Sequence, residues 1–373
     1  FAVRGEGEAT ILELFQSIFT GRKNFEKIDG LAWKKHNGEV VVNKRRSLLV
    51  EFDQLPLPAY HKIDMEHYLK MWDGTLRGIP VRGTLLETSR GCPWSCSFCS
   101  CPTIAGHRMR YRSEESLEAE IKLLRETYGV EGFMVTDDMF TVSMDHVKKV
   151  SKIMKKYNMI WTAQARVHAV TEEMLTIMKD ANCVQIDFGV ESGSQRILDE
   201  IINKKATTDQ ARKTFALCKK VGIRAMANLM LGNPTETEEE MLKTLELAKE
   251  IKPDYVFYSI VVPLPNTKLY EMINNLLPDS NKITMEDYKN IDWTGRFYSE
   301  KLNHSKVKDL QRIHKHFERE LHGLVIKNAI KNNLFYTKMM VIMPNRVERF
   351  GYIAKKMVNF FVVKRFYNKD LRL

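Results

Sequence analysis

The sequence contains no uninterrupted apolar run of the roughly 18 residues that a membrane-spanning helix requires, and no signal-peptide pattern opens it. Only six cysteines occur among 373 residues, too few for a fold held together by disulfides. Internal repeats and low-complexity tracts are also missing. Because 44% of the residues are hydrophobic and 28% are charged, the composition is that of a folded protein with a full core. These features exclude a disulfide-stapled or disordered protein.

The positive charge is concentrated at the C-terminal end. Residues 321–373 contain eleven Lys and Arg against two acids, Glu348 and Asp370, and so carry +9 of the total net charge of +11. We consider three interpretations, in order of preference: a solvated helical cap, a segment on an anionic membrane surface, which would suit a lipid-like substrate, and a nucleic-acid-binding segment. No RNA-binding module is visible, so we expect no nucleic-acid partner.

Between positions 83 and 275, short apolar runs alternate with helical patterns. The predicted strands cover 85–88, 133–138, 159–166, 184–191, 223–231 and 255–262, and the predicted helices 114–128, 144–157, 172–181, 209–221, 237–251 and 268–275. This alternation predicts the α/β class, with a parallel sheet and right-handed connections. Periodicity does not separate an open doubly wound sheet from a partial barrel. Either fold places ligands at the carboxyl ends of the strands.

The flanking segments have other patterns. Residues 10–20 have helical periodicity, and apolar runs on both sides of Gly38 indicate a hairpin. Residues 55–58 (LPLP) predict an extended linker. Residues 305–332 predict a helix, which a basic aromatic stretch at 334–367 follows. The chain begins with Phe1 rather than Met, and its first residues (FAVRGEGE) are typical of the interior of a domain. We therefore expect part of the N-terminus to be missing.

Four cysteines crowd into the segment SRGCPWSCSFCSCP, directly after the first predicted strand. Three of them, Cys92, Cys96 and Cys99, have C-x3-C-x2-C spacing, and Cys101 follows either as a fourth ligand or as a mere neighbour. Thiolates are soft ligands that suit iron–sulfur clusters or zinc. A structural zinc site needs further ligands at a distance, and Cys183 and Cys218 form no C-x2-C pair. Three ligands on a four-iron cluster leave one iron open for another molecule.

This segment resembles the signature of radical S-adenosylmethionine (SAM) enzymes, including the aromatic Phe98 before the third cysteine. The resemblance implies a [4Fe–4S] cluster on Cys92, Cys96 and Cys99, with SAM chelating the open iron and Phe98 lying by its adenine. An electron from the cluster would cleave SAM to methionine and a 5′-deoxyadenosyl radical. On this interpretation we expect a partial (β/α)6 barrel with a helical C-terminal extension. The alternative is a zinc knuckle or a chance grouping of cysteines.

Charged residues at the strand ends fit the resemblance. Asp137 and Asp138 end the second predicted strand, where the family binds the SAM ammonium group, although a helix cap or surface acid would have the same pattern. Arg166 could pair with the SAM carboxylate or form a structural salt bridge. Glu191 ends the fourth strand and could bond the ribose or the amino group, and its neighbours Gly189 and Gly193 indicate close approach of the backbone.

Two turns depart from the family pattern. Thr235 stands in GNPTET, and Asn266 in VPLPNT, where the family usually has glycine. Asparagine tolerates the left-handed backbone conformation better than most residues. These departures touch no predicted ligand.

A longer series of motifs resembles the radical SAM subgroup that carries an N-terminal cobalamin-binding domain. It comprises RMRYRS, FMVTDDMF, WTAQAR, FGVESGS, LGNPTET and VPLPNTKLYE. The resemblance implies a remnant of that domain and a linker at 1–80, a radical SAM core at 81–277 and a helical basic region at 278–373. The D-x-H-x-x-G motif that supplies a lower axial histidine is not present, and His61, His67 and His146 do not fit it. Cobalamin therefore stays an open expectation.

We expect a cytoplasmic enzyme that abstracts hydrogen from an unactivated carbon of a small-molecule or lipid-like substrate, with an electron donor such as flavodoxin or ferredoxin. The expected outcome is methyl transfer through cobalamin or an oxidative, cyclising rearrangement. One competing hypothesis is a non-catalytic iron–sulfur or zinc protein, which would not need Asp137 and Glu191. Another is a radical SAM methylthiotransferase, but the second cysteine set and RNA-binding module of such enzymes are not in this sequence.

Overall fold

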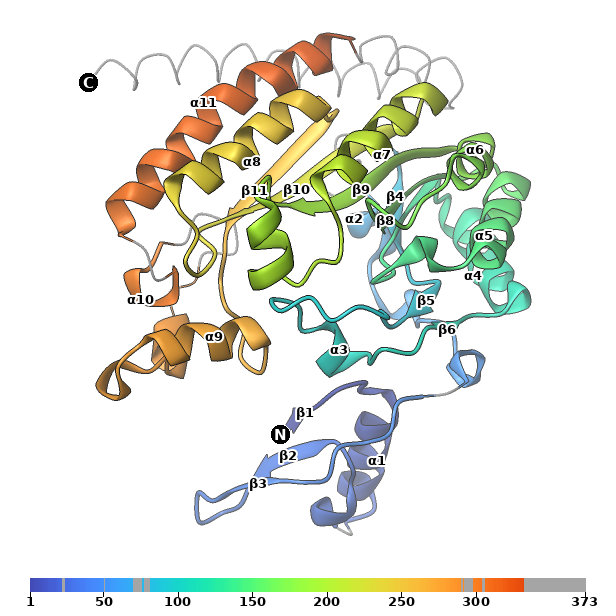
Figure 1. The fold of residues 1–373 in the computed structure, drawn as a ribbon. Coiled ribbons are helices and arrows are strands. Elements are labelled where there is room, and N and C mark those ends of the chain that lie inside the picture. Colours follow the sequence, from blue (N-terminus) through green and yellow to red (C-terminus); the bar gives the residue numbers. More distant parts are fainter. Residues whose placement is uncertain are drawn as a thin grey trace.

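The computed structural model describes residues 1–21, 24–49, 51–69, 76, 81–289, 291, 298–303 and 306–331 (Figure 1). Within α11 (Val307–Lys331), side chains are described as far as position 321 and at position 323. The predicted basic aromatic stretch at 334–367 lies outside the described residues. No described helix is both long enough and apolar enough to span a bilayer.

The centre of the molecule is a curved parallel sheet of six strands (Figure 1). The spatial order is β11-β10-β9-β8-β7-β4, so each strand lies beside the next one along the chain, and the predicted partial barrel is confirmed. In β9 almost every residue is buried, because helices cover the outer face of a parallel sheet. The strands are β4 (Gly83–Leu86), β7 (Gly132–Val135), β8 (Ile160–Arg166), β9 (Cys183–Glu191), β10 (Arg224–Leu231) and β11 (Tyr255–Ile260).

Each connecting helix begins at a hydroxyl side chain that accepts the N–H group of the third helical residue. Thr207 and Thr237 form complete capping boxes, and Gly129 and Gly222 end their helices in the left-handed conformation. Such local signals explain why the predicted helices are confirmed almost to the residue. The helices are α4 (Glu114–Tyr128), α5 (Met144–Lys156), α6 (Glu172–Asp180), α7 (Thr208–Val221), α8 (Glu238–Ile251) and α9 (Lys268–Leu276).

Residues 1–49 form a smaller unit next to the barrel. Its helix α1 (Glu8–Phe19) packs by Leu14 on a three-stranded sheet, and the predicted hairpin turns at Gly38, whose φ is +89°. The strands are β1 (Ala2–Val3), β2 (Leu31–Lys34) and β3 (Val40–Val42). The outer face of α1 leaves several large apolar side chains exposed, with Phe19 at 83%.

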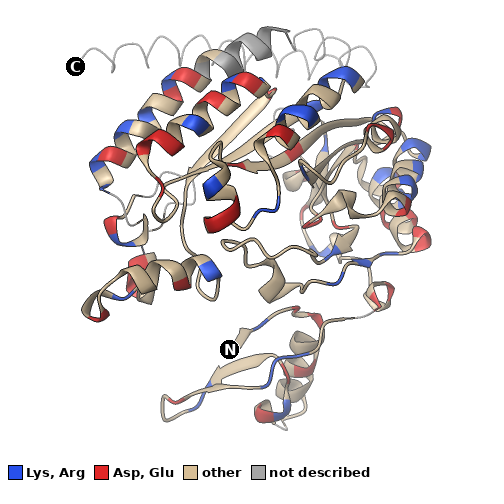
Figure 2. Ribbon diagram, in the orientation of Figure 1, with Lys and Arg blue, Asp and Glu red and all other residues tan. Residues whose placement is uncertain are grey.

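The remaining elements are short, apart from α11. They are α2 (Met65–Tyr68), β5 (Ser89–Arg90), α3 (Cys101–Ile104), β6 (Arg110–Tyr111) and α10 (Glu300–Asn303). Helix α11 packs against α8 and β11, where Arg312 pairs with Glu238 at 2.5 Å and Lys249 with Glu320 at 2.7 Å. Acidic and basic residues are interspersed along these two helices, as Figure 2 shows.

Two turns at the carboxyl end of the sheet hold non-glycine residues at positive φ. Thr235 has φ +62° and Asn266 has φ +64°, at the two positions where glycine is usual in the pattern described above. The left-handed conformation places Cβ against a carbonyl oxygen, and a β-branched residue suffers most from it. Sequence reasoning thus located both turns, and Thr235 is the more strained of the two.

Candidate cluster-binding site

The cysteine loop crosses the carboxyl end of the sheet between β5 and β6, which pair as a two-stranded ribbon. Segments far away in the sequence hold it in place. The N–H of Ser97 donates to the carbonyl of Ile202 at 2.8 Å, and the Ser97 carbonyl accepts the N–H of Leu269 at 2.9 Å. The amide of Asn203 donates to the carbonyl of Ser95 at 2.9 Å. The loop is therefore fixed by the residues that follow β9 and by the start of α9.

All four loop cysteines are free thiols and partly buried. The thiol of Cys101 lies within hydrogen-bonding reach of both Cys92 and Cys99. Its hydrogen bonds lower the pKa of Cys92 to about 6, with help from Arg166, and that of Cys99 to about 7. The same contacts raise the pKa of Cys101, so Cys101 keeps its proton while its neighbours become thiolates.

In the described part of the chain, no three His, Cys, Asp or Glu side chains converge closely enough to hold one metal ion. A four-iron cluster differs in this respect, because three thiolates bind three different irons and need not meet at one point. The spacing suits a cluster better than zinc, which needs its ligands at the corners of one tetrahedron.

Arg166 ends β8 and reaches the loop from the sheet. Its Nη1 donates to the Cys96 sulfur at 3.0 Å, and its guanidinium carbon lies 4.7 Å from the centre of the Trp94 ring. Its Nε and Nη2 atoms are buried without a hydrogen-bond partner among the described residues. Unpaired buried donors are costly, so these two atoms fit a ligand with acceptor oxygens, such as the carboxylate of SAM.

The two aspartates after β7 have different environments. Asp137 is 1% exposed and accepts the N–H groups of Thr88 at 2.7 Å and Ser89 at 3.0 Å, together with both their hydroxyl groups. His146 lies 3.4 Å away on α5. These contacts occupy the carboxylate and fasten the start of the cysteine loop. They do not support the expected ligand role of Asp137, since a carboxylate with four donors around it has little left for an ammonium group.

Asp138 is exposed and accepts the N–H of Gly91 at 3.2 Å, beside the cysteine thiols. Of the two expected ammonium-binding aspartates, Asp138 is the one whose carboxylate is open to a ligand. The two carboxylates thus differ in environment although the residues are adjacent in the segment that follows β7.

Glu191 ends β9 with φ +65° and forms a buried ion pair with Lys204 at 2.6 Å. The Lys204 ammonium also lies 6.0 Å from the centre of the Phe98 ring. A Cβ atom at Gly189 would overlap Glu191 and approach the Lys204 ammonium to 2.6 Å, and one at Gly193 would overlap the backbone of Lys243. The close backbone approach expected at both glycines is found at Gly193, whereas the close neighbours of Gly189 are the side chains of Glu191 and Lys204.

Sequence reasoning missed Trp94, His168 and Lys204. Trp94 stacks on Arg166 and meets His168 edge to face at 5.4 Å, and burial together with Arg166 and Lys204 lowers the pKa of His168. Lys204 follows an unpredicted π-helical turn, Ile197–Ile201, which brings it back to β9. The aromatic residue inside the cysteine motif was a visible signal for Trp94. Lys204 had no comparable signal.

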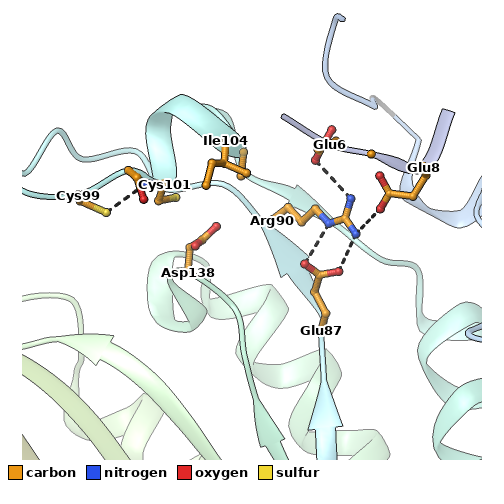
Figure 3. A pocket seen from close by; sticks show the side chains of 11 residues that line it. Glu6, Glu8, Glu87, Arg90, Cys99, Cys101, Ile104 and Asp138 are labelled. Atoms are coloured by element: carbon orange, nitrogen blue, oxygen red, sulfur yellow. Dashed lines mark hydrogen bonds and ion pairs between the residues drawn. The ribbon is translucent and has the colours of Figure 1, made fainter. Parts of the chain in front are cut away.

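A cavity of about 500 Å³ lies between the cysteine loop and the N-terminal unit. Figure 3 shows Cys99, Cys101 and Asp138 on one side and Arg90 with its acidic partners on the other. Arg90 binds Glu87 in a bidentate manner at 3.0 Å and pairs with Glu8 at 2.7 Å. Glu6 links the same network to Arg110 at 2.7 Å. The N-terminal unit is thus joined to the loop by ion pairs of low exposure.

Glu236, in the turn after β10, is 7% exposed and accepts the N–H and the side-chain amide of Asn233. Burial raises its pKa to about 7, from a normal value of 4.5.

Because of this raised pKa, the folded protein keeps a proton on Glu236 that the unfolded chain loses between pH 4.5 and 7. We expect the free energy of unfolding to fall by roughly 3 kcal/mol across that range. A Glu236→Gln variant should lose this pH dependence in urea unfolding, and an equal slope in both proteins would contradict the assignment.

The fold and the site define a class: a partial α/β barrel with a cysteine-rich loop at the carboxyl end of its sheet. A model of the radical SAM superfamily matches residues 86–248. The chain is 32% identical over 360 residues to an uncharacterized methyltransferase of Pyrococcus horikoshii, covering 95% of this chain and 71% of the relative. The chain belongs to the radical SAM superfamily. The predicted family, fold class and enzyme class are confirmed.

Two further comparisons extend this result. The chain is 28% identical over 276 residues to the cytidylyl-2-hydroxyethylphosphonate methyltransferase of Streptomyces wedmorensis, covering 66% of this chain and 51% of that protein. Among solved structures, it superimposes with a TM-score of 0.61 on OxsB, a cobalamin-dependent SAM radical enzyme with aqua-cobalamin and SAM bound. That likeness has 15% identity and covers 96% of this chain and 59% of OxsB, so it shows the fold alone. The chain spans between half and about seven tenths of these proteins.

Proposed function

We propose that this chain is the core of a cobalamin-dependent radical SAM methyltransferase. The observation that carries the proposal is the cysteine loop at the carboxyl end of the sheet, which holds Cys92, Cys96 and Cys99 and where the buried guanidinium of Arg166 donates to the sulfur of Cys96 at 3.0 Å. The relatives from Pyrococcus horikoshii and Streptomyces wedmorensis are both called methyltransferases, which favours methyl transfer over cyclisation.

In this proposal Cys92, Cys96 and Cys99 hold a [4Fe–4S] cluster, and SAM binds beside it. Together they supply reductive cleavage of SAM, which generates a radical able to abstract hydrogen. Arg166 offers its two unpartnered nitrogen atoms to the SAM carboxylate, and Asp138 offers an open carboxylate to the ammonium group. Glu191 is positioned by Lys204 to accept hydrogen bonds, and Phe98 provides an aromatic face. Each of these side chains is thus chemically complementary to a group of SAM.

Cobalamin and the partners belong to the same proposal. We propose residues 1–80 as the end of a cobalamin-binding domain and its linker, 81–277 as the radical SAM core and 278–373 as the helical basic region. A small molecule or a lipid-like compound is the proposed substrate, and flavodoxin or ferredoxin the reductant. The proposed location is the cytoplasm, with membrane contact through the basic tail as a further element.

The test is anaerobic reconstitution with iron and sulfide, followed by addition of SAM, dithionite and hydroxocobalamin. We expect about four irons and four sulfides per chain, formation of 5′-deoxyadenosine, and transfer of an isotopic label from the SAM methyl group to cobalamin. Label in cobalamin supports the methyltransferase. Deoxyadenosine without label would leave the radical SAM part standing and would give no support to cobalamin methylation by these residues. Bound zinc without a cluster would overturn both.

A further inference from the structure

Arg166 has an unusual set of neighbours for a buried arginine. It is 4% exposed, yet its Nη1 donates to the sulfur of Cys96 and no described acidic side chain forms an ion pair with it. The ring of Trp94 covers one face of the guanidinium. The structural salt bridge that the sequence left open is therefore not formed among the described residues. The arginine is instead directed at a cysteine of the loop.

A positive charge at this position has an electrostatic consequence. A guanidinium is a cation in proteins, and the burial of this one leaves its interaction with the sulfur little screened by water. A reduced cluster carries one more negative charge than the oxidised cluster, so the cation stabilises the reduced form more. Hydrogen bonds to cluster sulfurs and local charge are established means by which proteins set reduction potentials.

We infer that Arg166 is a positioning residue that raises the reduction potential of the cluster through its hydrogen bond to Cys96. The inference rests on the proposed function, because it requires Cys96 to be a cluster ligand. Trp94 confines the guanidinium, so the Nη1–sulfur contact has a fixed geometry. Nε and Nη2 remain for an anion, so the same side chain connects the cofactor site with the cluster.

The experiment is a redox titration of the reconstituted protein without SAM, followed by the electron paramagnetic resonance signal of the reduced cluster. The Arg166→Gln variant removes the charge. Arg224→Gln is the matched control, because Arg224 is another buried arginine but begins β10 at the opposite end of the sheet. At the midpoint potential of the parent, we expect the oxidised-to-reduced ratio of the Arg166 variant to rise about tenfold. That ratio corresponds to a shift of about 59 mV to a more negative potential.

The outcomes separate the inference from the proposed function. A parent chain that binds no cluster overturns both. A cluster present in all proteins with the same potential overturns the role of Arg166 alone, and so does an equal shift in both variants. Where Arg166→Gln fails to retain its cluster, Arg166→Lys replaces it. Lysine keeps the charge but loses the planar fork, and we expect a smaller shift in the same direction. No shift would again overturn the inference.

Discussion

Replacing Cys96 by alanine is expected to abolish cluster binding and SAM cleavage. Cys96 is one of three proposed ligands, and two thiolates leave two irons of the cluster without a protein ligand. Loss of an outer-shell partner already costs about 10–100-fold in metal affinity or activity, so loss of a ligand should reduce deoxyadenosine formation by at least about 100-fold. The measurements are iron and sulfide content, the visible absorption of the cluster, and deoxyadenosine formed after reconstitution.

Two cysteine variants serve as controls. Cys218→Ala removes a thiol that is fully buried on the inner face of α7, and Cys101→Ala removes the fourth thiol of the loop. We expect Cys218→Ala to keep cluster and turnover with a modest loss of stability. We expect Cys101→Ala to keep the cluster as well, because Cys101 is not one of the three proposed ligands and its single S–H group only hydrogen-bonds to Cys92 or to Cys99. A full cluster in Cys96→Ala and none in Cys101→Ala would reverse the roles of the two residues.

The sequence contained most of the fold because its signals are local. Strands show as apolar runs and helices begin at capping hydroxyls such as Thr207 and Thr237, so their bounds were predictable within a few residues. The place of the cysteine loop followed from the same alternation. Strained turns were also visible, since Thr235 and Asn266 stand where glycine is usual.

Side-chain partners across the fold were not predictable in this way. The pattern after β7 gave Asp137 and Asp138 the same expected role, but the first carboxylate is buried against Thr88 and the second is exposed. Lys204 approaches Glu191 only because a π-helical turn reverses the chain between them. Contacts of this kind depend on tertiary geometry, which cannot be derived from the hydrophobic periodicity of the sequence.

The structural role of Asp137 leads to the second large expected effect. Asp137→Ala leaves the buried N–H groups of Thr88 and Ser89 and their two hydroxyl groups without their acceptor. Each buried group that loses its partner costs about 1–3 kcal/mol. Because the hydroxyl groups can turn to other acceptors, we expect the free energy of unfolding to fall by about 3–5 kcal/mol rather than by the full sum. Urea unfolding under anaerobic, reducing conditions measures the change.

Two further variants distinguish this role from cofactor binding. In Asp137→Asn the amide oxygen still accepts both N–H groups, and its NH₂ group can donate to the hydroxyl groups of Thr88 and Ser89 after they rotate. We therefore expect a loss of about 1 kcal/mol, the contribution of the charge to these hydrogen bonds. Asp138→Ala, at an exposed neighbour with one accepted N–H, should change stability by less than about 1 kcal/mol. Equal losses at positions 137 and 138 would contradict the fastening role, whereas the expected order would mean that Asp137 holds the first residues of the cysteine loop and Asp138 is left for the ligand.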